Sequence, residues 1–303
     1  MGKLHSDKRR QGQRNASDYR AERGACGLSM KGSIHQIYVA IDGSVYAEPA
    51  IQWGVMLAKE ADAELTLVHC VEQRFYNSSL FMDLSGILGA APYRDNAEQL
   101  RSWLVSRGEN VLESGRKIAA QLGVTAKTDL LIGACSEKIC EAAKSANLVI
   151  LGRRGENCDD GSHLVGSDAE RIIRRLKCSC LVTPRFFDKP QTMVVGVNDS
   201  GPGRAAIQWA EYLHELFADC AVKPLHIREK DNDDDYSGSQ VAGAELELAD
   251  GNPEEALVAA CQDEKQLAII GVTGHSRSLR ELLLGTLSFN VLHHVQGPAL
   301  LAR

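Results

Sequence analysis

The stretch IYVAIDGSVYAEPAIQW, residues 37–53, has a counterpart in MVVGVNDSGPGRAAIQW, residues 193–209. Both end in the tetrapeptide AIQW, which begins eight residues after Asp42 in the first copy and eight residues after Asn198 in the second. Each copy therefore contains a short apolar run, a polar residue and a segment that ends in the same four letters. An internal repeat of this kind predicts that one structural unit has been built twice along the chain.

The two halves of the chain also end in similar sequence segments. The first half contains NLVILGRRG at 147–155, and the second contains LAIIGVTG at 267–274. In each, the last glycine of a G-x-x-G motif, Gly155 or Gly274, stands eleven positions before a pair made of glycine and a hydroxyl residue. These pairs are Gly166-Ser167 and Gly285-Thr286. Openings and closings that match at equal spacing predict a tandem duplication.

Length and charge fit two folded domains behind a short tail. A chain of 303 residues is long enough for about two domains, which we place at 33–187 and 188–303. Segment 1–32 carries eight Lys/Arg against three Asp/Glu and few large apolar residues, so we expect a disordered basic tail there. The net charge of the whole chain is −6, which disfavours nucleic acid as the main partner.

Hydropathy and cysteine usage indicate the cellular compartment that we expect for the protein. No apolar run approaches the roughly 18 residues of a membrane span, so we expect no membrane partner. The nine cysteines are odd in number and scattered, which is typical of reduced thiols in a cytoplasmic protein. Cys178 and Cys180 form the one close pair. Because no second pair or histidine accompanies them at ligand spacing, we favour packing there over a metal or redox site.

Apolar runs and helical periodicity alternate along the first half. The run IYVAI at 37–41 is typical of a strand buried on both faces. The predicted strands are 37–41, 64–71, 127–132, 147–151 and 179–183, and the predicted helices are 46–60, 95–121, 135–145 and 167–176. This alternation predicts an α/β fold, in which helices cover both faces of a parallel sheet.

The second half repeats the pattern over a shorter length. From the histidine in the second strand to the glycine after the fourth, the first half spans 83 residues and the second half 45. The missing length corresponds to the long second helix, so we expect the second domain to lack it. In its place stands an acidic loop, EKDNDDDYSGS at 229–239, which is typical of a solvated surface and has no EF-hand spacing.

Several features of the first half converge at the carboxyl ends of the predicted strands. Asp42 ends the first strand, Gly152 and Gly155 follow the fourth, and Gly166-Ser167 opens the next helix. Ligands of open α/β sheets bind at this edge, and a helix N-terminus offers free N–H groups to phosphate. The pattern predicts a nucleotide pocket in which the Asp42 carboxylate accepts hydrogen bonds from a ribose hydroxyl or a base amine. The competing interpretation is that each glycine only relieves a tight turn.

The same residues carry a family resemblance. The stretch AIDGS at 40–44, the strand end at His69 and the G-x-x-G motif followed by Gly-Ser or Gly-Thr resemble the universal stress protein family, over about residues 34–303 as two tandem copies. The resemblance implies two five-stranded parallel-sheet α/β sandwich domains, adenine-nucleotide α-hydrolase-like with flavodoxin-like layering. It also implies self-association through the last strands, as an intramolecular pseudo-dimer and, at a further level, a homodimer.

The ATP-binding branch of that family supplies candidate site residues. The resemblance places adenosine at the strand-end polar residue and the backbone after the second strand, and the phosphates at the glycine loop and the Gly-Ser/Thr pair. In the first half the matching residues are Asp42, Cys70, Gly152, Gly155, Gly166 and Ser167. In the second half they are Asn198, Ile227, Gly271, Gly274, Gly285 and Thr286, and the neighbouring His275 also suits phosphate. We expect no metal ligands among them.

The chain departs from the family pattern in three respects. Ten residues, where the family has nine, separate the second glycine from the Gly-Ser/Thr pair in each half. Asn198 replaces the acid and loses its charge. Three acids within 156–160 would repel a triphosphate unless Arg153 and Arg154 or a magnesium ion offset them.

Two functional hypotheses follow. The first is a cytosolic stress-response protein that binds ATP, with or without Mg²⁺, or a related adenine nucleotide as a signal. The sequence offers no nucleophile–base pair or paired carboxylates, so we expect no enzyme beyond at most a weak ATPase. The alternative is an interaction or scaffold module without any nucleotide, in which the duplication builds a stable pseudo-dimer.

Overall fold

The computed structural model of the chain describes residues 34–75, 93–155, 165–228, 239–272 and 286–303. The predicted basic tail and most of the predicted acidic loop lie outside these residues, as does the predicted glycine loop of the second half. No helix in the described part of the chain has both the length and the apolar character needed to cross a membrane.

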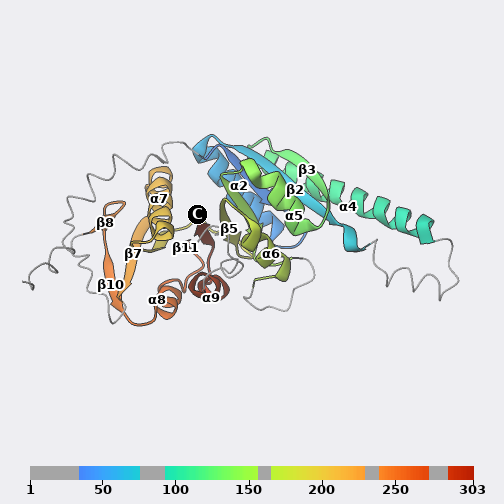
Figure 1. The fold of residues 1–303 in the computed structure, drawn as a ribbon. Helices are drawn as coiled ribbons and strands as arrows, with labels where there is room; N and C mark the ends of the chain where they lie inside the picture. The colour runs from blue at the N-terminus through green and yellow to red at the C-terminus, as the bar shows by residue number, and fades with distance from the viewer. Residues whose placement is uncertain (1–33, 76–92, 156–164, 229–238, 273–285) are drawn as a thin grey trace, which may run out of the picture. The chain divides into compact units, whose positions relative to one another are not determined.

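Helices and strands alternate through both halves (Figure 1). The strands of the first half are β1 (Gln36–Ala40), β2 (Glu64–Glu72), β3 (Lys127–Gly133), β4 (Leu148–Gly152) and β5 (Ser179–Thr183). Its helices are α2 (Ala47–Ala61), α4 (Tyr93–Gln121), α5 (Cys135–Ala142) and α6 (Ser167–Arg175), with 3₁₀ turns η2 (Gln73–Phe75) and η3 (Ala143–Ser145). The strands of the second half are β6 (Thr192–Gly196), β7 (Ala221–Arg228), β8 (Gln240–Val241), β9 (Ala244–Glu245), β10 (Glu247–Asp250), β11 (Gln266–Gly271) and β12 (Ala299–Ala302). Its helices are α7 (Gly201–Leu216), α8 (Pro253–Ala260) and α9 (Thr286–His294).

Each half contains five strands that run parallel to one another, as predicted. The order is β3-β2-β1-β4-β5 in the first half and β10-β7-β6-β11-β12 in the second. The chain moves outward in one direction from β1 and then in the other from β4. The carboxyl ends of β1 and β4 therefore flank the point where the strand order reverses, which is where ligands of open α/β sheets bind.

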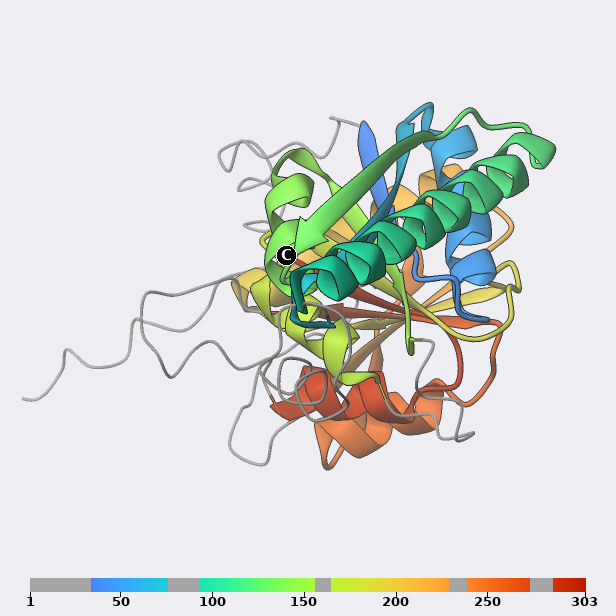
Figure 2. The same ribbon diagram turned by 90° about the vertical axis from the view of Figure 1, so that its right-hand side faces the viewer.

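The helices of the first half cover both faces of its sheet, because β1 and β4 are apolar on both sides. Helices α2 and α4 pack beside each other against β1, β2 and β3, while α5 and α6 pack together on the other side (Figure 2). Glycines allow the close approach on the first face. A Cβ at Gly54 of α2 would lie 2.7 Å from the Val39 side chain, and one at Gly108 of α4 would lie 2.7 Å from the His69 ring.

The second half has the same layers of helices around its sheet, but its described residues contain no counterpart of the long helix α4. Helix α7 packs against β6 and β11, and α8 and α9 pack together. Between β7 and β10, the described residues form the two-stranded hairpin β8–β9, which contacts α7 and β7 (Figure 1). Val241 of this hairpin is buried. The hairpin thus stands where the long helix α4 stands in the first half.

The two five-stranded sheets join through their last strands. β5 and β12 pair antiparallel, with Leu181 opposite Leu300, so all ten strands form one sheet. Each last strand has a neighbour on both sides within the chain, β4 and β12 for β5, and β11 and β5 for β12. Residues Ser33–Arg303 accordingly form a single compact unit. The boundary between 187 and 188 stays a prediction.

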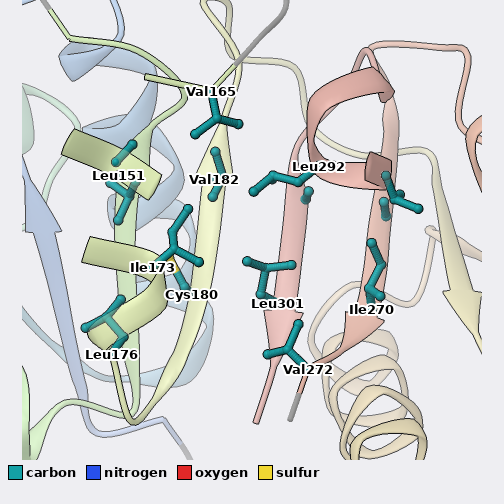
Figure 3. Close-up of a cluster of buried hydrophobic side chains, with 14 of the residues drawn as sticks. Leu151, Val165, Ile173, Leu176, Cys180, Val182, Ile270, Val272, Leu292 and Leu301 are labelled. Atoms are coloured by element: carbon teal, nitrogen blue, oxygen red, sulfur yellow. The ribbon is translucent and has the colours of Figure 1, made fainter. Parts of the chain in front are cut away.

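One hydrophobic core runs across this junction. Val165 and Val182 of the first half face Leu292 and Leu301 of the second (Figure 3). All four side chains are at most 8% exposed. The packing between α6, α9 and the strands beneath them therefore belongs to both halves at once.

The repeated AIQW segment also lies at the junction. Trp53 and Trp209 are almost fully buried, and Trp53 meets Phe187 edge-on with ring centroids 5.7 Å apart. The Trp209 indole N–H donates to Ser179 Oγ of β5 at 2.9 Å, which links α7 to the other half. The repeat that reveals the duplication thus helps to hold the two copies together.

Candidate functional site

The predicted pocket of the first half begins with a sharp turn after β1. Gly43 has a φ of +86°, a conformation that favours glycine, and it lets the chain turn from β1 toward α2. Asp42 Oδ1 accepts a hydrogen bond from the Ser44 N–H at 2.9 Å. This local bond fixes the carboxylate at the carboxyl end of β1.

The second glycine of the G-x-x-G motif lies directly against this carboxylate. A Cβ at Gly155 would lie 2.9 Å from Asp42 Oδ2, which is closer than real Cβ contacts allow. A Cβ at Gly166 would in turn lie 3.7 Å from the Gly155 nitrogen and 3.5 Å from the Arg154 Cα atom. Asp42, Gly155 and Gly166 are therefore contiguous at the point where the strand order reverses, as the sequence predicts.

Helix α6 begins at Ser167, and its N-terminus points into this arrangement. The Gly166 N–H donates to the Arg153 carbonyl at 2.8 Å and so is not available to a ligand. No side chain caps the helix, and within the described residues nothing accepts a hydrogen bond from the N–H groups of 167–169. These three N–H groups, at the positive end of the helix dipole, are those that could bind an anion.

The first glycine of each motif has a packing role. A Cβ at Gly152 would lie 2.5 Å from the Tyr46 Cβ, and one at Gly271 would collide with the Pro202 carbonyl. Tyr46 and Pro202 occupy equivalent positions at the start of the first helix in each half. Both glycines therefore let that helix approach the sheet closely. This packing accounts for both glycines without a ligand, and it differs from relief of the turn that follows the strand.

The equivalent residues of the second half are arranged differently. The Asn198 amide oxygen accepts hydrogen bonds from the Ser200 hydroxyl and the Ser200 N–H, at 2.5 and 3.2 Å. Ser200 in turn caps α7 by accepting from the Gly203 N–H at 3.1 Å. A Cβ at Gly203 would collide with Asn198. Both Asp42 and Asn198 accept from the N–H group two residues on, and Asn198 also accepts from the hydroxyl of Ser200, the residue that caps α7.

The remaining candidates of the second half fall at or beyond the limits of the described residues. Gly274, His275 and Gly285 lie outside them. Thr286 is the first residue of α9, so the helix begins where the Gly-Thr pair predicts. Ile227 lies in β7 and is half-buried against the core.

Cys70 lies on the part of β2 that extends past the end of β1. The pairing of β1 with β2 ends at Ala40 and Val68, whose carbonyl accepts from the Ile41 N–H. Alternate carbonyls of a strand point the same way, so the Cys70 carbonyl faces the space beyond the end of β1. The Cys135 thiol donates to this carbonyl at 3.3 Å.

The bond from the Cys135 thiol to the Cys70 carbonyl joins residues that are 65 positions apart, which the scattered cysteine spacing does not indicate. The hydrogen bond with the Cys70 side chain raises the pKa of the Cys135 thiol far above its ordinary value, and burial raises it further. The Cys135 thiol is therefore neutral at physiological pH. The described residues contain no group of three His, Cys, Asp or Glu side chains that could hold a metal ion.

Two histidines in equivalent strands have a structural role. His69 Nδ1 donates to the Ile41 carbonyl at 2.8 Å, and His226 Nδ1 donates to the Val197 carbonyl at 2.8 Å. Each bond ties the second strand to the residue that follows the first strand. Both rings thus support the turn that positions Asp42 or Asn198.

Arg153, one of the two arginines that could offset the acids within 156–160, is instead bound within the fold. Its side chain is 3% exposed and donates to the Val295 carbonyl at 2.8 Å and the Gly297 carbonyl at 2.6 Å. Burial lowers its pKa to about 10, so it stays charged at neutral pH. The guanidinium completes the C-terminal end of α9, where helix carbonyls lack partners of their own. Sequence reasoning missed this role because the acceptors lie in the other half.

A cavity in the first half lies away from these residues. It is an open hollow lined by the C-terminal part of α5, the 3₁₀ turn η3 and the segment at the end of α6, near the amino ends of β4 and β5, and Cys140 and Cys178 are among its lining residues. Burial raises the pKa of Cys140 to about 11 and also raises that of Cys178, so both thiols are neutral. The cavity shares no residue with the predicted nucleotide pocket.

Comparison with known proteins identifies the family. The sequence model of the Universal stress protein family matches residues 33–184, half of the chain. The chain belongs to the universal stress protein family. It is 27% identical to Universal stress protein Slr1230 of Synechocystis sp. over 297 residues, which span 88% of this chain and 99% of that protein. It is 30% identical to Universal stress protein MJ0531 of Methanocaldococcus jannaschii over 152 residues, half of this chain and 82% of that protein.

Solved structures agree with the tandem arrangement. A universal stress protein from Archaeoglobus fulgidus superimposes with a TM-score of 0.63 at 15% identity, over 88% of this chain and 96% of that chain. A Pseudomonas aeruginosa protein described as functionally unknown, PA1789, gives a TM-score of 0.58 at 15% identity over 89% of this chain and 92% of that one. At this identity the likeness concerns the fold. It supports the fold predicted from the repeat, two universal stress protein units in tandem.

Proposed function

We propose that this universal stress protein is a cytosolic, non-catalytic stress-response protein that binds ATP or a related adenine nucleotide in its first half. One observation carries the proposal: Asp42, Gly155 and Gly166 are contiguous beside the N-terminus of α6, where the N–H groups of 167–169 have no acceptor among the described residues. A carboxylate suits the ribose, and the helix N-terminus suits the phosphates. In this proposal occupancy of the site is the signal, and the protein is at most a weak ATPase.

The second half is the weaker candidate. Its Asn198 lacks the negative charge of Asp42, and its amide oxygen accepts a hydrogen bond from the Ser200 hydroxyl, which in turn caps α7. We therefore propose one nucleotide per chain. We also propose that self-association is satisfied within the chain as a pseudo-dimer, because both last strands already have two neighbours.

Calorimetric titration with ATP, in the presence and absence of Mg²⁺, tests the proposal. The expected result is one site per chain with a Kd of about 100 µM or tighter. Asp42→Ala removes a carboxylate acceptor and should weaken binding by about ten- to a hundredfold, since hydrogen bonds to charged groups contribute about 1.5–3 kcal/mol. The matched variant Asn198→Ala should leave affinity and stoichiometry unchanged. Equal effects of the two variants would contradict the assignment to the first half.

A second candidate function is a nucleotide-free interaction module. The bond from the Gly166 N–H to the Arg153 carbonyl and the packing of Gly152 against Tyr46 favour it, because two expected ligand contacts serve the fold instead. Thermal unfolding separates the candidates. ATP at a hundred times its Kd stabilises a native state that binds it by about 2.7 kcal/mol. An unchanged Tm at millimolar ATP would therefore support the interaction module.

A further inference from the structure

The last helix of the second half touches the phosphate-binding segment of the first half at two points. Arg153 reaches from the glycine loop to the carbonyls at the C-terminal end of α9, and its own carbonyl accepts from the Gly166 N–H. His293 of α9 meets the same segment one residue earlier, where its Nδ1 atom accepts from the Val165 N–H at 3.3 Å. The residues that precede the N-terminus of α6 are therefore held from the other half.

The bond from Val165 requires one particular form of His293. A backbone N–H can only donate, so Nδ1 must carry a lone pair and the ring proton must lie on Nε2. The ring packs against Phe289, with centroids 4.1 Å apart. Nε2 is buried and has no hydrogen-bond partner among the described residues. A doubly protonated ring would place an N–H against the Val165 N–H, and the bond would be lost.

Charged groups surround His293 on three elements. Glu170 and Arg174 face it from α6, Arg153 faces it from the loop after β4, and His294 is its neighbour on α9. Burial lowers the pKa of His293 below its ordinary value of 6.5, Glu170 opposes this shift, and His294, Arg153 and Arg174 add to it. The neutral ring that the Val165 bond requires is thus the form present at pH 7.

We propose that neutral His293 is a positioning residue for the first half's anion-binding segment, and that its protonation releases Val165 and loosens the N-terminus of α6. The binding consequence rests on the proposed function, because the N–H groups of 167–169 are the proposed phosphate donors. A fall in pH would then weaken nucleotide binding in the first half through a residue of the second. The fixed N–H groups lose their alignment when the segment that leads into them loses its hydrogen bond.

Amide hydrogen exchange of the full-length protein tests the positioning role without any ligand. We expect the exchange protection factor of the Val165 N–H to fall by about three- to tenfold between pH 7.5 and 4.5, since a hydrogen bond contributes about 0.5–1.5 kcal/mol and the lowered pKa of His293 places its protonation well below pH 6.5. His293→Asn keeps an acceptor near the Nδ1 position but cannot titrate, so its protection should stay high at both pH values. His293→Leu should show low protection at both. His294→Asn is the control, because His294 is exposed and bonds to Asn290 of its own helix.

Titration with ATP at the two pH values is the second arm. Between pH 7.5 and 4.5 we expect the affinity of the wild type and of His294→Asn to fall by about three- to tenfold more than that of His293→Asn. The His293→Asn variant still shows the change that protonation of ATP itself causes. Protection of Val165 that ignores pH, or that falls equally in His293→Asn, would overturn the inference even if ATP binds. If the exchange pattern is as expected but ATP does not bind, the proposed function is contradicted and the positioning role of His293 is still supported.

Discussion

At the residue scale, one sequence difference between the halves gives the two tryptophans of the repeat different hydrogen bonding. Trp209 donates its indole N–H to Ser179 of the other half at 2.9 Å. The strand position equivalent to Ser179 in the second half is Pro298, which has no side-chain acceptor. The Trp53 indole nitrogen is buried without a hydrogen-bond partner among the described residues. The pseudo-symmetry is thus kept in packing and broken in hydrogen bonding.

Replacement of each tryptophan by phenylalanine should measure this difference. Trp209→Phe leaves the Ser179 hydroxyl without its indole donor, so we expect it to lower the free energy of unfolding by about 1 kcal/mol more than Trp53→Phe does, beyond the similar loss of ring area. Urea unfolding followed by circular dichroism gives both values. The Ser179→Ala background serves as a control, because there the two substitutions should cost the same. Equal costs in the native background would contradict the role of Ser179.

The sequence indicates which candidate residues lie together when all of them belong to the same half of the chain. Asp42, Gly155 and Gly166 lie together because each follows a strand or precedes a helix of the same half. Arg153 and His293 could not be assigned in this way. Their partners are 142 and 128 residues away, in the other copy of the repeat. No spacing rule within one copy indicates which residues meet across the junction.

At the element scale, the helices and strands predicted for the first half match the structure to within three residues at each end, because buried strands and amphipathic helices have distinct apolar periods. Periodicity does not reveal how closely an element packs. In α4, a Cβ at Gly108 would lie 2.7 Å from the His69 ring, and one at Gly115 would lie 2.8 Å from the end of the Ile41 side chain. The His69 ring is held by its bond to the Ile41 carbonyl, whereas the end of an Ile side chain can move.

The two glycines of α4 should therefore respond differently to alanine. Alanine in a helix interior gains about 1 kcal/mol over glycine, whereas overpacking costs about 1–3 kcal/mol. We expect Gly108→Ala to lower the free energy of unfolding by about 1 kcal/mol and Gly115→Ala to stay within about 0.5 kcal/mol of the wild type. Ser106→Ala, at an exposed position of the same helix, is the control. Stabilisation by Gly108→Ala would show that His69 moves freely.

At the scale of the whole molecule, each half completes the end of a helix in the other. Arg153 donates to the carbonyls of Val295 and Gly297 after α9, and Arg303 donates to those of Ile173 and Leu176 around the end of α6. Cationic side chains are favourable at a helix C-terminus, where the last carbonyls lack partners. These contacts, together with the shared sheet and core, predict that the two copies unfold as one.

Substitution of these arginines tests that cooperativity. Arg153→Met and Arg303→Met each remove a buried or half-buried guanidinium and leave backbone carbonyls at or after a helix end unpaired, so each should lower the free energy of unfolding by about 2–4 kcal/mol. Both should shift the same single urea transition, seen alike by tryptophan fluorescence and by circular dichroism. Arg116→Met removes only an exposed ion pair with Glu113 and should change stability by less than about 0.5 kcal/mol. Two separate transitions, with each arginine variant moving only one, would mean that the duplicated units are energetically independent despite their common sheet.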